Sequence, residues 1–208
     1  MNMGQGKGTF LCLEGLDKSG KDTQQEMLRD WLEAQGYDVV FTREPGGTPI
    51  GEKIRKVLLA GNNPMSPKTE ALLFMASRAE FVPEVVVPAI ERGQIVLTSR
   101  YFFSTFGYQG FGRGLSIEDM IWLAMFATGK LIPDLTILLD IDVDTMLSRL
   151  NRKAADRIER EGSDFFERIR SGYLWLSEDS KWGMKVVDGS QPISEVHTRI
   201  RTLVEKVL

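Results

Sequence analysis

Residues 9–24 read TFLCLEGLDKSGKDTQ, and this stretch decides the fold. Its first part, Thr9–Glu14, is an apolar run that stops at a glycine, which predicts a buried strand. Gly15, Gly20 and Lys21 then fit the beginning of G-x-x-x-x-G-K-[ST], a loop whose backbone N–H groups surround phosphates. Helical spacing follows from Thr23 to Gln35, so a helix N-terminus adds positive potential to the loop. Strand, loop and helix together predict a phosphate-binding site rather than a simple glycine-rich turn.

The residue after Lys21 departs from this pattern, because Asp22 stands where a hydroxyl would hold magnesium. A bare carboxylate about 4 Å from a phosphate oxygen costs several kcal/mol at an effective dielectric of about 20. A magnesium ion between the two reverses the sign, since both are its usual ligands. In the alternative reading, Asp22 only occupies the first turn of a helix, where the dipole stabilises it by roughly 0.3–1 kcal/mol.

A second departure lies at the end of the strand predicted over Gln94–Thr98. Phosphate-loop enzymes usually carry an aspartate there that orients magnesium, and this chain has Ser99. The two departures are reciprocal, so we hypothesise a swapped metal site in which Asp22 and Ser99 face one magnesium ion. Asp140, which lies in another predicted strand, is the competing candidate for the second position.

Strands alternate with helices along the rest of the chain, and the strands are mostly apolar. This pattern predicts an α/β fold with a parallel sheet covered by helices on both faces. The other predicted strands are Asp38–Thr42, Leu135–Ile141 and Met184–Val187. The other predicted helices are Lys53–Ala60, Lys68–Arg92 with Pro83 and Pro88 breaking or kinking it, Ser116–Gly129 with Ser116 as N-cap, Val143–Arg152, Phe165–Glu178 and Ile193–Leu208. We expect a single domain over residues 1–208.

The composition, 42% hydrophobic and 26% charged, is that of an ordinary soluble globule. A net charge of −3 argues against a large nucleic-acid surface, although a nucleotide needs only a local positive cluster. No apolar run is long enough to span a membrane, and the first residues do not resemble a signal peptide, so we expect a cytoplasmic protein. Cys12 is the single cysteine, which excludes an internal disulfide and a cysteine-rich zinc site.

Five motifs, in order along nearly the whole chain, resemble thymidylate kinase. They are LEGLDKSGKDTQ (13–24), TREPGGT (42–48), LLFMASRAEF (72–81), RYFFSTFGYQGFGRG (100–114) and DRIEREGSDFF (156–166). The resemblance implies the P-loop nucleoside-monophosphate-kinase fold, with a five-stranded parallel sheet and a short lid. It implies magnesium-dependent transfer of the γ-phosphoryl group of ATP to dTMP, giving dTDP and ADP for dTTP synthesis, by a homodimer. In that family the motif SRY normally begins with aspartate, so Ser99 departs from it, whereas position 22 is less strict.

The resemblance also implies roles for individual residues. The ATP-binding loop would comprise Gly15, Leu16, Asp17, Lys18, Ser19, Gly20, Lys21, Asp22 and Thr23. The dTMP site would comprise Arg43 at the acceptor phosphate, Glu44, Phe74 beneath the thymine, Arg78 at its edge, Arg100, Thr105, Gln109, and Tyr108, which crowds the sugar 2′ position. By periodicity alone, Phe74 reads more readily as a core residue. The residues 188–192 (DGSQP) would lie beside adenine, and His197 reads as a surface residue.

The expected catalytic residues are Lys21, Arg100, Arg157 and Asp17. Lys21 and Arg100 would neutralise the transferring phosphoryl group, which is the main task in this chemistry. Asp17 would position groups near the sugar and acceptor phosphate. Arg157 belongs to a charged stretch at about 152–163, too polar for a core, which we interpret as a flexible lid. The lid cations Arg152, Lys153, Arg157 and Arg160 alternate with acidic residues, so a solvated charge run is the alternative.

Two other functions stay open at this point. One is a kinase for another deoxynucleoside monophosphate. The other is a non-catalytic nucleotide-binding homologue, in which Asp22 and Ser99 mark a lost metal site.

Overall fold

A parallel sheet with the strand order β2-β3-β1-β4-β5 forms the centre of the molecule. This computed structural model describes residues 7–60, 64–151, 153 and 155–208. The strands are β1 (Thr9–Glu14), β2 (Val39–Arg43), β3 (Ile95–Ser99), β4 (Leu135–Asp140) and β5 (Lys185–Asp188). All of the pairings are parallel, as predicted. Because β1 lies between β3 and β4, its carboxyl end delivers the phosphate loop to the middle of the sheet edge where such folds bind ligands.

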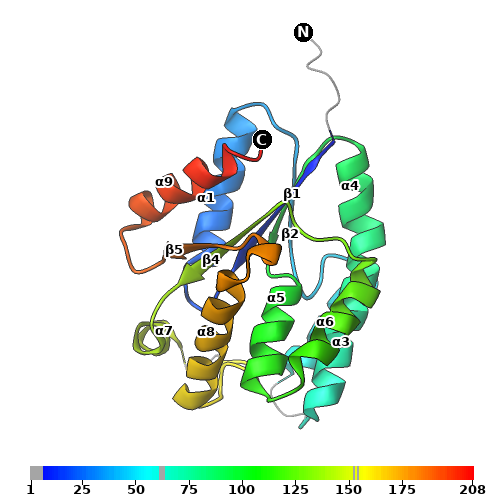
Figure 1. The fold of residues 1–208 in the computed structure, drawn as a ribbon, viewed down its shortest axis with the longest axis vertical. Coiled ribbons are helices and arrows are strands. Elements are labelled where there is room, and N and C mark those ends of the chain that lie inside the picture. The colour runs from blue at the N-terminus through cyan, green and yellow to red at the C-terminus, as the bar shows by residue number, and fades with distance from the viewer. Residues whose placement is uncertain (1–6, 61–63, 152, 154) are drawn as a thin grey trace.

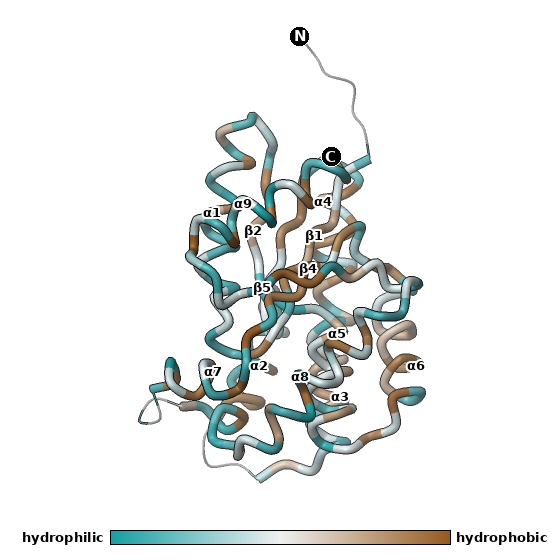
Figure 2. The backbone as a smooth tube through the Cα atoms, turned by 60° about the vertical axis from the view of Figure 1, so that its left-hand side comes forward, coloured by the Kyte–Doolittle hydropathy of each residue, from teal (hydrophilic) through white to brown (hydrophobic). Residues whose placement is uncertain are grey.

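Helices cover both faces of this sheet, which confirms the predicted layers (Figure 1). On one face, α1 (Lys21–Ala34) and α9 (Ile193–Val204) pack their apolar stripes against the strands, with Leu28 and Ile200 fully buried. The opposite face is covered by α3 (Pro67–Phe81), α4 (Val87–Glu91), α5 (Phe102–Thr105), α6 (Ile117–Thr128) and α8 (Ser163–Glu178), and it holds the larger cluster of buried side chains. Figure 2 shows the hydrophobic colour concentrated on the central strands, as expected for strands buried on both sides.

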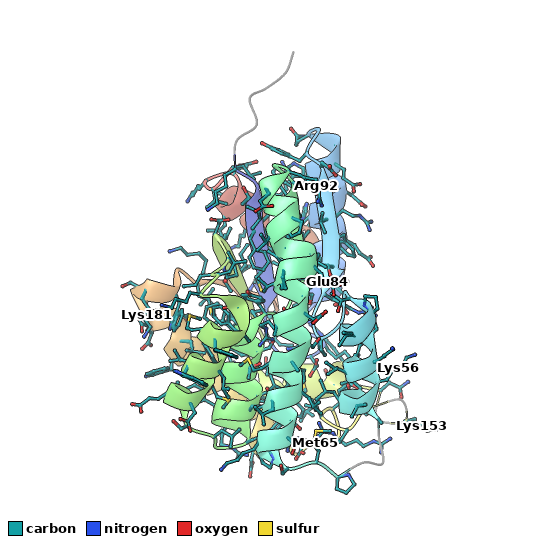
Figure 3. The ribbon with its side chains drawn as sticks, turned by 90° about the vertical axis from the view of Figure 1, so that its right-hand side faces the viewer. Lys56, Met65, Glu84, Arg92, Lys153 and Lys181 are labelled. Atoms are coloured by element: carbon teal, nitrogen blue, oxygen red, sulfur yellow. The ribbon has the colours of Figure 1, made fainter. Side chains whose placement is uncertain are left out.

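One long helical rod runs along the side of the molecule. It consists of α3 (Pro67–Phe81), a π-helical turn (Val82–Val86) and α4 (Val87–Glu91). Figure 3 labels Met65 and Arg92 at its two ends, with Glu84 between them. Pro83 lies in the π turn and Pro88 in the first turn of α4, and the helical path continues through both although proline has no N–H to donate.

The remaining helices are α2 (Pro49–Leu59), α5 (Phe102–Thr105), α6 (Ile117–Thr128), α7 (Val143–Arg149) and α8 (Ser163–Glu178), with a 3₁₀ turn at Ser180–Trp182. The predicted Ser116 cap is confirmed, since its Oγ accepts from the Asp119 N–H at 3.2 Å. The predicted start of α2 at Lys53 is wrong: Thr48 caps the helix and Pro49 opens it.

The sequence pattern gave no sign of the segment that follows β3. There, α5 continues directly into a π-helical segment (Phe106–Gly112), and the two are almost entirely buried. Two predicted helix ends also lie too far along the chain, since α7 ends at Arg149 and α9 at Val204. In the described part of the chain, none of the helices has the length and apolarity that a membrane crossing requires.

Candidate active site

The phosphate loop joins β1 to α1 and folds around the amine of Lys21. Gly15 and Gly20 take φ angles of 139° and 96°, which a side chain would resist. The Lys21 amine donates to the carbonyls of Gly15 and Leu16 at 3.0 and 2.6 Å, and to the Ser19 hydroxyl at 3.3 Å. Burial lowers the pKa of Lys21 to about 7, and the charge of Arg100 adds to the shift. An anion in the loop would stabilise the charged amine.

A cavity of about 710 Å³ lies over this loop. It brings together many of the residues that the sequence analysis named, from the loop, the ends of β2 and β3, and the turn after β5. They are Asp17, Lys18, Ser19, Gly20, Lys21, Asp22, Thr23, Arg43, Glu44, Ser99, Arg100, Gly189 and Gln191. Seven further lining residues had no such role in the sequence analysis, namely Gln24, Arg55, Arg149, Asp156, Glu159, Ile193 and Val196.

Asp17, Arg100 and Tyr108 form one hydrogen-bonded group beside the loop. The Arg100 guanidinium is ion-paired with Asp17 and donates to the Tyr108 hydroxyl at 3.0 Å, and this hydroxyl donates to Asp17 at 2.9 Å. Arg100 also lies over the Tyr108 ring, 4.9 Å from its centroid. Burial opposes ionisation of Asp17, but Arg100 and Lys21 outweigh it and lower the pKa of Asp17.

Glu14, which the sequence analysis did not single out, holds the segment after β3 in place. Its fully buried carboxylate accepts from the Tyr101 N–H at 2.7 Å, the Ser104 hydroxyl at 2.6 Å and the Tyr173 hydroxyl at 2.9 Å. Directly before the first of these anchors, Arg100 adopts a φ of 70°, a conformation that residues with side chains rarely take. Glu14 thereby helps to fix the direction of Arg100.

Glu44 and Arg78 form a buried ion pair next to both cavities. Arg78 Nε donates to Glu44 Oε2 at 2.7 Å, and its other nitrogens donate to Thr105 Oγ1 and the Tyr101 carbonyl. Burial raises the pKa of Glu44 to about 7, although Arg78 opposes the shift. Glu44 Oε1 is buried and has no hydrogen-bond partner among the described residues. Arg78 does not line either cavity, so its predicted contact with a base edge stays a prediction.

A smaller cavity of about 100 Å³ adjoins the first. Its lining includes Phe74, Tyr108 and Gln109, three of the residues predicted around the thymine and sugar. Thr105 does not line this cavity, and its hydroxyl accepts a hydrogen bond from Arg78. The two cavities share the lining residues Asp17, Glu44, Arg55, Arg100 and Asp156. A ligand in one cavity and a ligand in the other would therefore both border these side chains.

The two metal candidates lie on the lining of the larger cavity. Asp22 is exposed in the first turn of α1, and Ser99 ends β3. Asp140, the competing candidate, is held by both ends of the Arg170 guanidinium at 2.8 and 2.9 Å and does not line this cavity. Among the described residues, no cluster of three or more His, Cys, Asp or Glu could by itself hold a metal. Any bound cation would therefore take part of its ligands from hydroxyl, carbonyl, phosphate or water oxygens.

The described part of the lid segment (Lys153 and residues 155–163) approaches the end of α2. Arg157 is ion-paired with Glu70 at 2.6 Å and donates to the Leu58 carbonyl at 3.1 Å, so it does not line the phosphate cavity. Figure 3 shows Lys56 of α2 and Lys153 of the lid segment on the same side of the molecule. Arg149, just before the lid, lines the cavity and donates to the Lys18 carbonyl at 3.1 Å. Arg152 lies outside the described residues.

Arg55 was also missed, although it follows the end of the motif TREPGGT (42–48) by only seven positions. It lies on α2, donates to the Pro45 carbonyl at 2.9 Å and lines both cavities. Burial and the charge of Arg43 lower the pKa of Arg55. This cluster of positive charge suits an anionic group at the point where the two cavities meet.

Comparisons with known proteins agree with this geometry. The family model described as thymidylate kinase matches residues 13–200. The chain is 44% identical to the thymidylate kinase of Thermoanaerobacter sp. (strain X514), over 97% of this chain and 100% of the relative. It is 45% identical to that of Pseudomonas fluorescens (strain Pf0-1), over 97% of each. The crystal structure of thymidylate kinase from Ehrlichia chaffeensis superposes with a TM-score of 0.78 at 27% identity, covering 96% of this chain and 99% of that one.

These matches confirm the family and the P-loop kinase fold that the five motifs predicted. The chain belongs to the thymidylate kinase family.

Proposed function

We propose that this chain transfers the γ-phosphoryl group of ATP to dTMP across the boundary of its two cavities. The ATP phosphates lie on the loop of residues 15–23, and dTMP lies in the smaller cavity with its phosphate towards the larger one. The observation that carries this proposal is the set of residues common to both cavities: Asp17, Glu44, Arg55, Arg100 and Asp156. Two arginines among them suit the place where donor and acceptor phosphates must approach.

Each cation then has a distinct task. Lys21 contacts the β- and γ-phosphates from inside the loop, while Arg100 bridges donor and acceptor. Arg43 and Arg55 hold the acceptor phosphate, whose attacking oxygen is already anionic, so no general base is needed. Asp17 keeps Arg100 and Tyr108 aligned through the bonds described above. Positioning and charge neutralisation supply the catalysis, in keeping with a loose transition state.

Oxygen ligands suitable for magnesium line the larger cavity. Asp22, Ser99 and the unpartnered Oε1 of Glu44 belong to residues that line the larger cavity. We propose that Asp22 and Ser99 hold the ion, with Glu44 as a further oxygen donor. Magnesium would supply charge neutralisation on the phosphate oxygens.

The lid would close over the ATP phosphates and exclude water. In the conformation described here, Arg149 lines the larger cavity, and Arg157 would reach the phosphates only after leaving Glu70 and Leu58. We further propose that the enzyme works in the cytoplasm as a homodimer. An apolar face on α3 and α6 supports the dimer, because Leu72, Trp122 and Phe126 are 54%, 66% and 77% exposed there.

Product analysis tests the proposed reaction. The chain is incubated with ATP, dTMP and magnesium, and nucleotides are separated by anion exchange. We expect equal amounts of ADP and dTDP. The Lys21→Met variant should make neither at a comparable rate. ADP without dTDP would reveal hydrolysis of ATP, and the proposed acceptor would be wrong.

A further inference from the structure

A buried carboxylate outside the phosphate site, Glu70, accepts a hydrogen bond from a residue of the smaller cavity. Glu70 lies in the first turn of α3 and is 0% exposed. Its oxygens accept from Gln109 Nε2 at 2.7 Å, from Arg113 Nε and Nη2 at 3.2 Å each, and from Arg157 Nη1 at 2.6 Å. One carboxylate thus joins the nucleobase side of the site to two arginines.

These arginines keep Glu70 ionised. Burial opposes the charge, but hydrogen bonds from Arg113 and Gln109, together with the positive charge of Arg113, lower the pKa of Glu70. An ionised carboxylate has no proton to donate and can only accept. Gln109 must therefore turn its NH₂ group towards Glu70, because its carbonyl oxygen would otherwise face a negative charge.

The other end of the Gln109 amide is then fixed as well. Gln109 lines the smaller cavity, and no group of the described residues donates to its Oε1. The cavity therefore offers an acceptor and not a donor at this position. Thymine and uracil carry an N–H at N3, which matches an acceptor, whereas N3 of cytosine is itself an acceptor and would be repelled.

We propose that Glu70 is a positioning residue for base selectivity: by accepting from Gln109 Nε2, it makes Gln109 Oε1 the atom that meets N3 of the pyrimidine. The inference rests on the proposed function, since it concerns the acceptor nucleotide of that reaction. It extends the site to a residue that does not line either cavity.

The Glu70→Gln variant tests this directly. Its amide can donate to Gln109, which allows Gln109 to rotate and present NH₂ to the base. We measure kcat/KM for dTMP, dUMP and dCMP in the intact chain. The ratio of dTMP to dCMP should fall about tenfold or more, as for the loss of one matched hydrogen bond in a dry site. The ratio of dTMP to dUMP should stay unchanged, because both bases carry N3–H.

Two further variants separate positioning from simple structural damage. In Glu70→Gln/Gln109→Glu the acceptor-only group moves to position 109, so the preference for dTMP over dCMP should return. Gln109→Ala keeps all the ion pairs of Glu70 and should also lower the ratio of kcat/KM for dTMP to that for dCMP. This variant tests the inference even if Glu70→Gln does not fold. Equal losses for all three nucleotides in Glu70→Gln, or an unchanged ratio in Gln109→Ala, would overturn the inference. If the wild-type chain shows no turnover with dTMP, the proposed function is refuted instead.

Discussion

Arg78 Nε lies 2.7 Å from Glu44 Oε2, and both side chains are only 1% exposed. Removing one member of such a pair leaves an uncompensated buried charge. We expect Arg78→Met to lower the free energy of unfolding by about 3–5 kcal/mol near pH 8, measured by urea titration. Glu44→Gln/Arg78→Met should recover much of this loss.

The pH dependence of that loss has a definite sign. The pKa of Glu44 is already raised to about 7 in the folded chain, so the protonated form is favoured by folding and stability from this group falls as pH rises from about 4.5 through 7. Without Arg78 the pKa rises further, so Arg78→Met should lose less stability at pH 5.5 than at pH 8. A loss independent of pH would show that Glu44 is not the group left unpaired.

The buried amine of Lys21 predicts a proton linkage to ATP binding. With a pKa of about 7 in the nucleotide-free chain, most Lys21 amines are neutral at pH 8. Phosphates would raise this pKa, so ATP binding at pH 8 should take up close to one proton. Calorimetry in two buffers of different ionisation enthalpy measures the uptake. Identical apparent enthalpies in both buffers would argue against a neutral Lys21 in the free protein.

The Tyr108 hydroxyl bridges Asp17 and Arg100, whereas its ring borders the smaller cavity. Tyr108→Phe removes the bridge and keeps the ring. We expect about a tenfold lower kcat with an unchanged preference for deoxyribose over ribose acceptors. Tyr108→Ala should in addition relax that preference. The sugar selectivity is not controlled by the ring if dTMP and its ribose counterpart keep the same rate ratio in Tyr108→Ala.

A double-mutant cycle tests the metal site. Asp22→Ser and Ser99→Asp should each lower magnesium-dependent turnover about 10- to 100-fold, because each changes one oxygen donor of the ion. The double variant should restore much of the activity. In magnesium titrations, the apparent affinity for magnesium should likewise fall in each single variant and recover in the double variant. Simple addition of the two losses would mean that the residues do not share one ion.

Arg149 and Arg157 are the two candidates for the cation that assists phosphoryl transfer from the lid side of the site. Arg149 borders the phosphate cavity, and Arg157 is bound to Glu70 and Leu58. Arg149→Met should therefore reduce kcat more than Arg157→Met, by about 10²-fold or more for a cation at the transferring group. The reverse order in single-turnover experiments would show that the lid rearranges and brings Arg157 to the phosphates.

The sheet and the phosphate loop could be predicted from the sequence because both depend on short, local sequence patterns. Apolar runs indicated the strands, and the loop motif at 15–21 indicated where β1 passes into α1. The buried segment at 102–112 was not readable, since its aromatic residues follow neither a helical nor a strand period. Its conformation depends on Glu14, a partner about ninety residues away in sequence.

The candidate site was predictable where a motif carried the residue. Asp17, Lys21, Arg43 and Arg100 lie on the lining of one cavity, as the family resemblance implied. Arg55 and Glu70 were missed because their significance comes from contacts with distant residues, which a single sequence does not display. For Arg157 the motif named the residue, and the structure adds the ion pair with Glu70 that holds it away from the cavity.

We propose that an enzyme with Asp22 and Ser99 in its metal site still phosphorylates dTMP. The most direct measurement is ADP formation from ATP and magnesium, with dTMP, dUMP, dCMP, dGMP and dAMP each offered as acceptor. We expect turnover with dTMP well above that with the other four. A folded chain that binds ATP and turns over none of the acceptors would contradict the proposed phosphorylation of dTMP, because its phosphate loop would then bind nucleotide without catalysing transfer.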